Sequence, residues 1–171
     1  MESLTQRPNV VQRALHVLTR TRAGAWFFAR TLHHLDRSAL RLSRGRYSLT
    51  SILAGLPVVL ETTIGAKSGQ PRSLPLVAMP DGETLILIAS NFGQRHHPAW
   101  YYNLRAHPHV QVTYQGKTRF YLASELSGTA RERYWQKVVS LYSGYARYQQ
   151  RAGKRQIPLM CLTPQNHPPD R

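Results

Sequence analysis

VVLETTIGAKSGQPRSLPLVAMPDGETLILIA, residues 58–89, alternates short β-prone runs with two kinds of turn. The runs are rich in β-branched and aliphatic residues, which predicts strands over 58–62, 72–79 and 84–89. Asp81-Gly82 separates the last two runs, and this dipeptide is typical of a tight hairpin turn. A longer turn that contains two glycines follows the first run. The stretch therefore favours consecutive antiparallel strands.

The same pattern continues toward the C-terminus. Gln115-Gly116 provides a second hairpin turn, Pro98 opens a short helix over 99–106, and the capping box Thr129-Ala-Arg-Glu132 precedes a helix to about residue 141. Three further strands are predicted, over 110–114, 118–124 and 157–162. Mostly antiparallel strands with few helices favour an α+β, mainly β fold, namely a small barrel with peripheral helices.

Length and composition indicate one globular domain. The chain has 171 residues, of which 42% are hydrophobic, and this is enough to build a single core. We divide it into a basic N-terminal segment (1–50), a barrel body (57–163) and a tail (164–171). The single cysteine, Cys161, excludes an internal disulfide, and the sequence shows neither a signal peptide nor a long apolar run. We therefore expect a cytoplasmic protein.

The chain is strongly basic, with 23 Lys and Arg against 8 Asp and Glu, a net charge of +15. Such a field attracts nucleic acid, anionic lipid or a multiply charged cofactor, and charge alone does not choose among them. Apolar residues at helical spacing, Trp26 and Phe27 among them, predict amphipathic helices over 8–44. These helices either cover the domain or make a peripheral contact with anionic lipid at the inner face of the membrane.

Gly65-Ala-Lys-Ser-Gly-Gln-Pro-Arg72 has the composition of an anion-binding loop. Its glycines permit close approach of the backbone, Ser68 adds a hydroxyl, and Lys67 and Arg72 offer charge-assisted hydrogen bonds. The spacing from glycine to lysine differs from that of a Walker loop. An exposed turn with solvated charges explains the same residues equally well, so local composition leaves both interpretations open.

Two other groups of residues are candidates for a site. Ala89-Ser-Asn-Phe-Gly93 is a strand end followed by a loop, and nearby Trp100 either walls a ligand or belongs to the core. Tyr142, Tyr145 and Tyr148 are spaced three apart, which on one helix forms a stripe that lines a pocket or packs in the core. Four histidines at positions 96, 97, 107 and 109 lack nearby cysteine or carboxylate, so no metal site is expected.

Several of these blocks together resemble the deazaflavin (F420)-dependent nitroreductase family of bacteria. The blocks are Glu61-Thr-Thr-x-Gly-x-Lys-Ser-Gly-Gln-Pro-Arg72, then Ala89-Ser with a later Pro-x-Trp-Tyr-x-Asn-Leu, and the three tyrosines before the closing Ile157-Pro. They occur in order and at the family's spacing over residues 58–163. The chain departs from the pattern at Ala66, where many relatives have Arg, and at Asn91, where some have Lys.

The resemblance implies a split β-barrel that binds coenzyme F420 and passes a hydride to a small quinone-like, nitroaromatic or enone acceptor. Lys67 and Arg72 look like phosphate ligands, and Tyr142, Tyr145 and Tyr148, with Ser90, look like the residues at the acceptor. The other implied cofactor contacts are Ser68, Gly69, Gln70, Pro75, Leu76, Val77, Ala89, Ser90, Asn91 and Trp100. The two departures put the affinity for the cofactor in question.

Two alternatives remain at this level. FMN also combines a phosphate with a flat ring, so an FMN-binding reductase on the same barrel is the alternative enzyme. A non-catalytic nucleic-acid-binding protein would explain the pI of 10.9, but no recognition module is found and nucleic acid is not expected as a partner. Split barrels often form dimers, and the sequence leaves a homodimer open.

Overall fold

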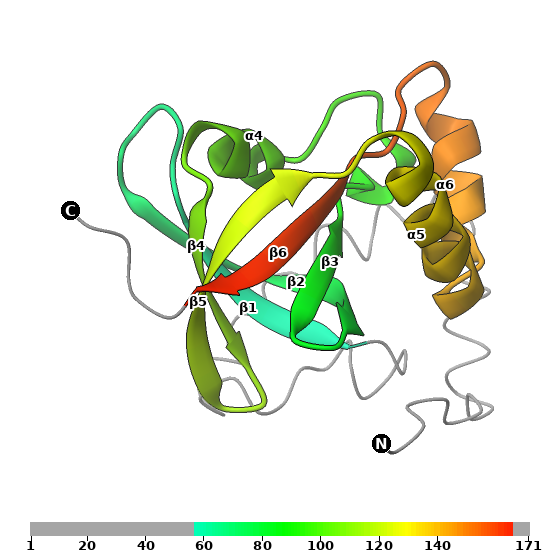
Figure 1. Cartoon of the computed structure of the whole chain (residues 1–171). Helices are drawn as coiled ribbons and strands as arrows, with labels where there is room; N and C mark the ends of the chain where they lie inside the picture. The colour runs from blue at the N-terminus through cyan, green and yellow to red at the C-terminus, as the bar shows by residue number, and fades with distance from the viewer. Residues whose placement is uncertain (1–56, 166–171) are drawn as a thin grey trace, which may run out of the picture.

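The strands form a closed barrel, in which three connections are short turns and the other two contain helices (Figure 1). The computed structural model describes residues 57–165. The strands are β1 (Val58–Ile64), β2 (Pro71–Asp81), β3 (Thr84–Ile88), β4 (His109–Tyr114), β5 (Lys117–Glu125) and β6 (Leu159–Gln165). Their order around the ring is β1-β2-β3-β6-β5-β4, and each neighbouring pair is antiparallel. The predicted mainly β barrel of antiparallel strands is confirmed.

Both predicted hairpin turns are present. Gly82 follows β2 and has a φ of +64°, and Gln115 and Gly116 join β4 to β5 with φ values of +50° and +77°. A pair of positive φ angles suits the right-handed twist of a two-residue hairpin, and glycine adopts this conformation without strain. The local turn residues therefore set the register of these two hairpins.

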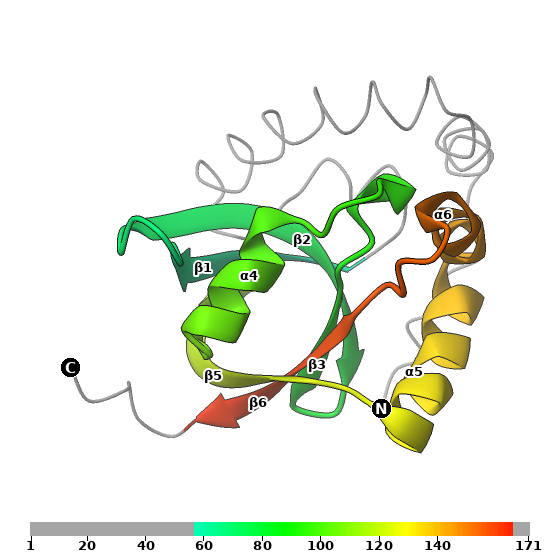
Figure 2. The ribbon, with the colours of Figure 1, turned by 90° about the horizontal axis from the view of Figure 1, so that it is seen from above.

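Alternating residues of the strands fill the barrel, and a helix covers one of its ends. Val59, Leu87, Val112 and Leu162 are among the inward-facing residues of this core. The helix α4 (Ala99–Ala106) lies across the opening in Figure 2, and it adds three buried side chains to the same cluster, Trp100, Tyr101 and Leu104. The bounds of α4 agree with the predicted helix over 99–106.

A second apolar cluster lies outside the barrel, where two helices pack beside β3 and β6 (Figure 2). These helices are α5 (Gly128–Leu141) and α6 (Gly144–Ala152). The cluster includes Ile86 and Ile88 of β3, Leu159 of β6 and Val138 of α5. Tyr134 of α5 donates a hydrogen bond to the Asp81 carboxylate at 2.7 Å, which ties α5 to the end of β2.

The structure corrects three predictions. Thr129 does not cap α5, because Ser127 occupies the N-cap position and the helix begins at Gly128. The last strand begins at Leu159 rather than 157, since the Ile157 N–H donates to Gln149 Oε1 and Pro158 has no N–H to offer. The same strand continues through Gln165 rather than ending at 162. The three tyrosines do not share one helix: Tyr142 is the C-cap of α5, and the other two lie on α6.

The predicted amphipathic helices over 8–44 lie outside the described residues. Within residues 57–165, no helix has the length and apolar character needed to cross a bilayer.

Candidate functional site

The loop between β1 and β2 is fixed by its own backbone. The Gly65 N–H donates to the Gln70 carbonyl at 2.9 Å, and the Gly69 N–H donates back to the Gly65 carbonyl at 2.8 Å. Gly69 has a φ of +64°, which suits glycine. At Gly65, a Cβ would lie 2.6 Å from Ser68 Oγ and 3.3 Å from the Gln70 carbonyl oxygen, so a side chain there would displace the Ser68 hydroxyl. The two glycines of the motif therefore shape the loop.

Asn103 of α4 holds this loop against the end of the barrel. Its Oδ1 accepts a hydrogen bond from the Ala66 N–H at 3.0 Å, and its Nδ2 donates to Thr63 Oγ1 at 3.3 Å. Thr63 is buried at the end of β1. A single amide side chain thus fixes both the loop and the strand that leads into it.

The tip of the loop keeps the groups that an anion requires. Lys67, Ser68 and Arg72 are exposed. Within the described part of the chain, the N–H groups of Lys67 and Ser68 have no hydrogen-bond acceptor, whereas those of Ala66 and Gln70 donate within the fold. Adjacent unpaired N–H groups beside two cations form a suitable cradle for a phosphate. The donor set fits a phosphorylated cofactor.

A second loop, residues 89–98, joins β3 to α4 and contains the short 3-10 helix η1 (Asn91–Gly93). Asn91 and Phe92 have φ values of +47° and +54°, which lie in the left-handed region that residues other than glycine rarely adopt. The Asn91 Nδ2 donates to the His96 carbonyl at 3.1 Å and closes the loop on itself. Strained backbone of this kind persists only where its surroundings hold it in place.

Arg155, in the linker between α6 and β6, supplies that support. Its Nε donates to the Gln94 carbonyl at 2.9 Å, and its Nη2 donates to the Ser90 carbonyl at 2.7 Å. Its Nη1 donates to the Ala89 carbonyl at 3.2 Å and lies 3.1 Å from His97 Nδ1. One guanidinium therefore contacts four residues of the loop.

Tyr142, Tyr145 and Tyr148 are brought together although they belong to two helices. Their rings meet edge to face, with centroids 5.4 to 6.2 Å apart. Burial raises the pKa of Tyr145 and of Tyr148 well above the ordinary value, and the neighbouring Tyr142 adds to both shifts. Both phenols stay neutral near neutral pH and are therefore able to donate a hydrogen bond, although the raised pKa makes each a weaker acid.

The tyrosine cluster contacts the 89–98 loop directly. The rings of Phe92 and Tyr148 are 6.0 Å apart in an edge-to-face arrangement. Gly93 is buried against α6, and a Cβ on it would lie 2.7 Å from the Tyr148 carbonyl oxygen. The candidate cofactor loop and the candidate acceptor residues therefore form one continuous structure.

The remaining predicted cofactor contacts divide between two surfaces. The side chains of Leu76, Ala89 and Trp100 pack with the core inside the barrel, whereas Val77 packs with the outer cluster. Pro75 lies on the same face of β2 as Val77, because alternate residues of a strand share a face. Gly69 and Gln70 are exposed on the first loop. Trp100, only 5% exposed, is a core residue of the barrel.

One buried acid lies inside the barrel. Glu61 of β1 is fully buried, and neither of its carboxylate oxygens has a hydrogen-bond partner among the described residues. It shares the inward face of the strand with Val59 and Thr63, and it pairs in register with Leu74 and Val112 on the neighbouring strands. Desolvation raises the pKa of this carboxyl well above its usual range.

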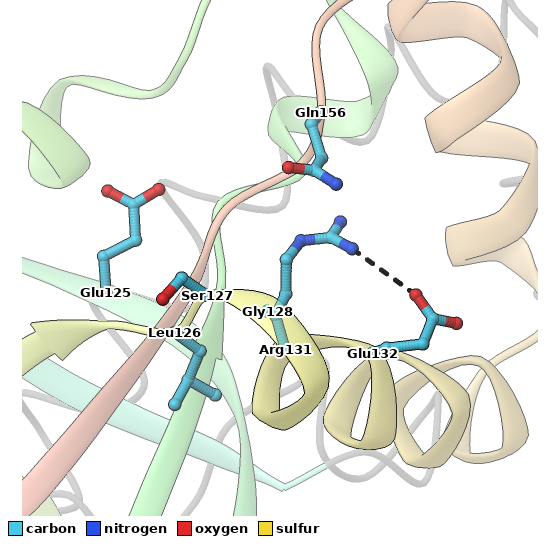
Figure 3. Close-up of a pocket in the computed structure, with 7 residues that line it drawn as sticks. All are labelled: Glu125, Leu126, Ser127, Gly128, Arg131, Glu132 and Gln156. Carbon is cyan, nitrogen blue, oxygen red and sulfur yellow. Dashed lines mark ion pairs between the residues drawn. The ribbon is translucent and has the colours of Figure 1, made fainter.

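A separate hollow of about 500 Å³ lies where β5 leads into α5 (Figure 3). In this view the Arg131 guanidinium extends toward Gln156, and its Nη2 donates to the Ile157 carbonyl at 3.1 Å. None of the predicted site residues line this hollow. Two carboxylates, those of Glu125 and Glu132, line it beside Arg131, so it is poorly suited to an anionic cofactor.

Sequence reasoning missed three residues that organise the site, Asn103, Phe92 and Arg155. The Asn-Leu of α4 was part of the resemblance, but nothing local to Asn103 indicated a partner 37 residues away. In residues 57–165, no group of three or more His, Cys, Asp or Glu side chains is arranged to hold a metal ion. His97 instead contacts Arg155.

Comparison with known proteins shows which protein family this chain matches. The sequence pattern of the family described as "F420H(2)-dependent quinone reductase" matches residues 36–164. An F420H(2)-dependent quinone reductase of Mycobacterium tuberculosis strain H37Rv is 35% identical over 140 residues, which cover 76% of this chain and 93% of that protein. A protein of Mycobacterium bovis with the same family name matches to the same extent.

Solved structures of related proteins have the same barrel. One, described as an F420-H2 dependent reductase (FDR-A), superposes with a TM-score of 0.57 at 39% identity, covering 62% of this chain and 93% of that one. Another, described as a domain-swapped dimer, superposes with a TM-score of 0.60 at 34% identity, covering 74% of this chain and 94% of that one.

Proposed function

The chain belongs to the F420H(2)-dependent quinone reductase family and is an F420-dependent oxidoreductase, and on this basis we propose how its residues divide the work. The loop at residues 65–72 binds the cofactor phosphate, the 89–98 loop flanks the ring, and the tyrosine cluster receives the acceptor. The observation that carries the proposal is the tip of the first loop, where the N–H groups of Lys67 and Ser68 have no acceptor among residues 57–165 and lie beside an exposed ammonium.

The phosphate is held by Lys67 and Arg72, with the hydroxyl of Ser68 and the two free N–H groups as further donors. Charge-assisted hydrogen bonds of this kind contribute about 1.5–3 kcal/mol each. Ala66 supplies no cation to the phosphate, and its N–H already donates to Asn103, so this position serves the shape of the loop. Likewise, the Asn91 side chain is engaged with the His96 carbonyl.

When bound, reduced F420 supplies a hydride from its ring to a quinone-like acceptor. The protein's part is to orient the two reactants, exclude water and stabilise the charge that develops on the acceptor oxygen. Tyr145 Oη is proposed to donate a hydrogen bond to that oxygen, with Tyr142 and Tyr148 shaping the pocket and Ser90 at its edge. Burial keeps the Tyr145 phenol neutral, which is the protonation state this role requires.

Cofactor titration tests the assignment. The full-length protein is titrated into F420 and, separately, into FMN, and the fluorescence of each is followed. We expect saturable quenching with F420 and a much weaker response with FMN, followed by oxidation of F420H(2) when a soluble quinone is added. Tighter binding of FMN than of F420 would contradict the proposed cofactor.

We further propose that the protein forms a homodimer, since a relative 34% identical to it is described as a domain-swapped dimer. Size-exclusion chromatography with light scattering measures this directly. A mass near twice the chain mass of 19.5 kDa is expected, and a monomer at all accessible concentrations would contradict it.

We also propose a peripheral contact with anionic membrane through residues 8–44, which lie outside the described part of the chain. The support is the combination of Arg residues with Trp26 and Phe27 in that segment. Co-sedimentation with anionic vesicles, compared with neutral vesicles, tests the contact. If neither kind of vesicle retains the protein, the membrane contact is contradicted and residues 8–44 are left with the alternative role of covering the domain.

A further inference from the structure

Arg155 orients the peptide groups of the 89–98 loop. The carbonyl oxygens of Ala89, Ser90 and Gln94 all accept hydrogen bonds from its guanidinium. Residues 57–165 contain no cis peptide bond, and in a trans peptide the N–H points away from the preceding carbonyl. The Asn91 N–H, in the same peptide unit as the Ser90 carbonyl, is therefore directed away from Arg155.

The N–H groups on that opposite side are available to a ligand. Within the described residues, neither the Asn91 N–H nor the Phe92 N–H has a hydrogen-bond acceptor. Ser90 has right-handed helical backbone angles and Asn91 has a φ of +47°. Successive residues of this kind bring their N–H groups together into a concave donor site.

We propose that Arg155 is a positioning residue of the cofactor site, which holds the loop carbonyls inward so that the N–H groups of Asn91 and Phe92 face the bound cofactor. The proposal rests on the proposed function, because it takes residues 89–91 as the flank of the deazaflavin ring. Arg155 itself need not touch the cofactor.

The same contact also sets the position of the acceptor residues. Gly93 packs against the backbone of Tyr148, with space only for a hydrogen at its Cα. A loop released from Arg155 would therefore move Phe92 and Gly93 relative to α6. Cofactor affinity and the placement of Tyr148 depend on one side chain that belongs to neither group.

Only arginine has the donors for this role. A guanidinium offers five N–H donors spread around a planar group, whereas a lysine ammonium offers three from a single nitrogen on a flexible stem and cannot reach all of these acceptors at once. Lys154, the adjacent residue, is exposed and provides a matched control that removes the same unit charge without touching the loop.

The experiment compares full-length wild type, Arg155→Gln, Arg155→Lys and Lys154→Gln. We measure the Kd for F420 by fluorescence and, without cofactor, hydrogen exchange of the peptides that cover residues 89–98. Arg155→Gln is expected to raise the Kd at least about tenfold, in line with the loss of charge-assisted hydrogen bonds. Exchange should accelerate in the loop and not in β2 or β3. Arg155→Lys should be intermediate, and Lys154→Gln should change the Kd by less than about twofold.

The outcomes separate this proposal from the proposed function. Failure of the wild type to bind F420 contradicts the proposed function. Faster hydrogen exchange confined to residues 89–98 in Arg155→Gln would still support the role of Arg155 in positioning the loop. A Kd and exchange pattern like those of the wild type in both Arg155 variants overturn the positioning role. If Arg155→Gln does not fold, as judged by circular dichroism, Arg155→Lys decides by the same two measurements.

Discussion

Gly93 lies directly against the backbone of Tyr148: a Cβ built on Gly93 would come within 2.7 Å of the Tyr148 carbonyl oxygen and 2.9 Å of its Cα. The φ of Gly93 is +75°. Two independent constraints, one from backbone conformation and one from contact, therefore require glycine where the 89–98 loop meets α6.

Gly93→Ala should destabilise the protein and separate the loop from α6. The left-handed conformation alone costs alanine about 1–2 kcal/mol, and the contact with rigid backbone adds to this. Thermal unfolding measures the loss. Gly82→Ala in the β2–β3 hairpin is the matched control, because Gly82 has a similar φ of +64° and, among the described residues, no atom lies within 4 Å of a Cβ on it. Equal loss of stability in the two variants would show that the contact with Tyr148 carries no energy.

Lys67→Ala and Arg72→Ala should each weaken F420 binding and leave the fold intact. Both side chains are exposed, and loss of one charge-assisted phosphate contact should raise the Kd at least about tenfold. Lys117→Ala is the control, since it removes the same charge from the β4–β5 hairpin, away from this loop (Figure 1). Titration curves for Lys67→Ala and Arg72→Ala that overlay the wild type would remove the phosphate assignment.

Tyr145→Phe should slow turnover while it preserves folding and cofactor binding. The ring, which packs between Tyr142 and Tyr148, is retained, and only the hydroxyl is lost. We expect kcat for quinone reduction to fall by roughly ten- to a thousandfold, as for the loss of one acid or oxyanion donor.

Tyr134→Phe is the control for this change. It removes from α5 a hydroxyl that donates to the Asp81 carboxylate, and it keeps the ring that packs against the outer cluster, so stability should fall slightly and kcat should be unchanged. A parental rate for Tyr145→Phe would mean that Tyr145 serves packing and that the proton comes from another source.

Glu61 should make the protein less stable as the pH rises. Its folded-state pKa lies above the unfolded value of about 4.3, so above that pH the unfolded chain releases a proton that the folded protein retains. The free energy of unfolding therefore decreases from about pH 4 up to the folded-state pKa and is then constant with respect to this group.

Urea unfolding of Glu61→Gln and Glu61→Leu between about pH 5 and 8 tests this. Both variants should lose that part of the pH dependence, and Glu61→Leu should gain about 1–3 kcal/mol near neutral pH, because it removes a buried carboxyl that has no hydrogen-bond partner in the described part of the chain. Glu83→Gln, an exposed acid, is the control. A wild type whose stability is independent of pH in this range would place the Glu61 carboxyl in a solvated environment.

The barrel was predictable because its signals are local. The alternating strands and the dipeptides Asp81-Gly82 and Gln115-Gly116 depend on near neighbours in the chain, and the structure has both hairpins where they were expected. The break between α5 and α6 was not predictable in this way. There the Tyr142 ring folds back over Gly144 and would overlap a Cβ at that position, a contact that helical periodicity does not reveal.

The contacts of Arg155 with the 89–98 loop could not be predicted for a related reason. Arg155 is one of 23 basic residues, and its acceptors lie 58 to 66 residues earlier in the chain. Composition showed that positive charge was abundant, but it did not distinguish cations that face a ligand from one that organises the backbone. Likewise, the sequence left open whether Trp100 lines a pocket or belongs to the core, and the structure shows that it is buried in the barrel.

Because α5 and α6 are separate helices that meet at Tyr142 and Ser143, the three tyrosines form a module inserted between β5 and β6. The loops at residues 65–72 and 89–98 belong to other connections of the barrel. Under the proposed division of roles, the residues that receive the acceptor lie on a different connection of the barrel from the two loops that hold the cofactor, and they meet the 89–98 loop only where Phe92 and Gly93 contact Tyr148. Libraries confined to residues 142–150 should yield reductases with new acceptor ranges, provided that Gly144 and the Tyr148 backbone against Gly93 are kept.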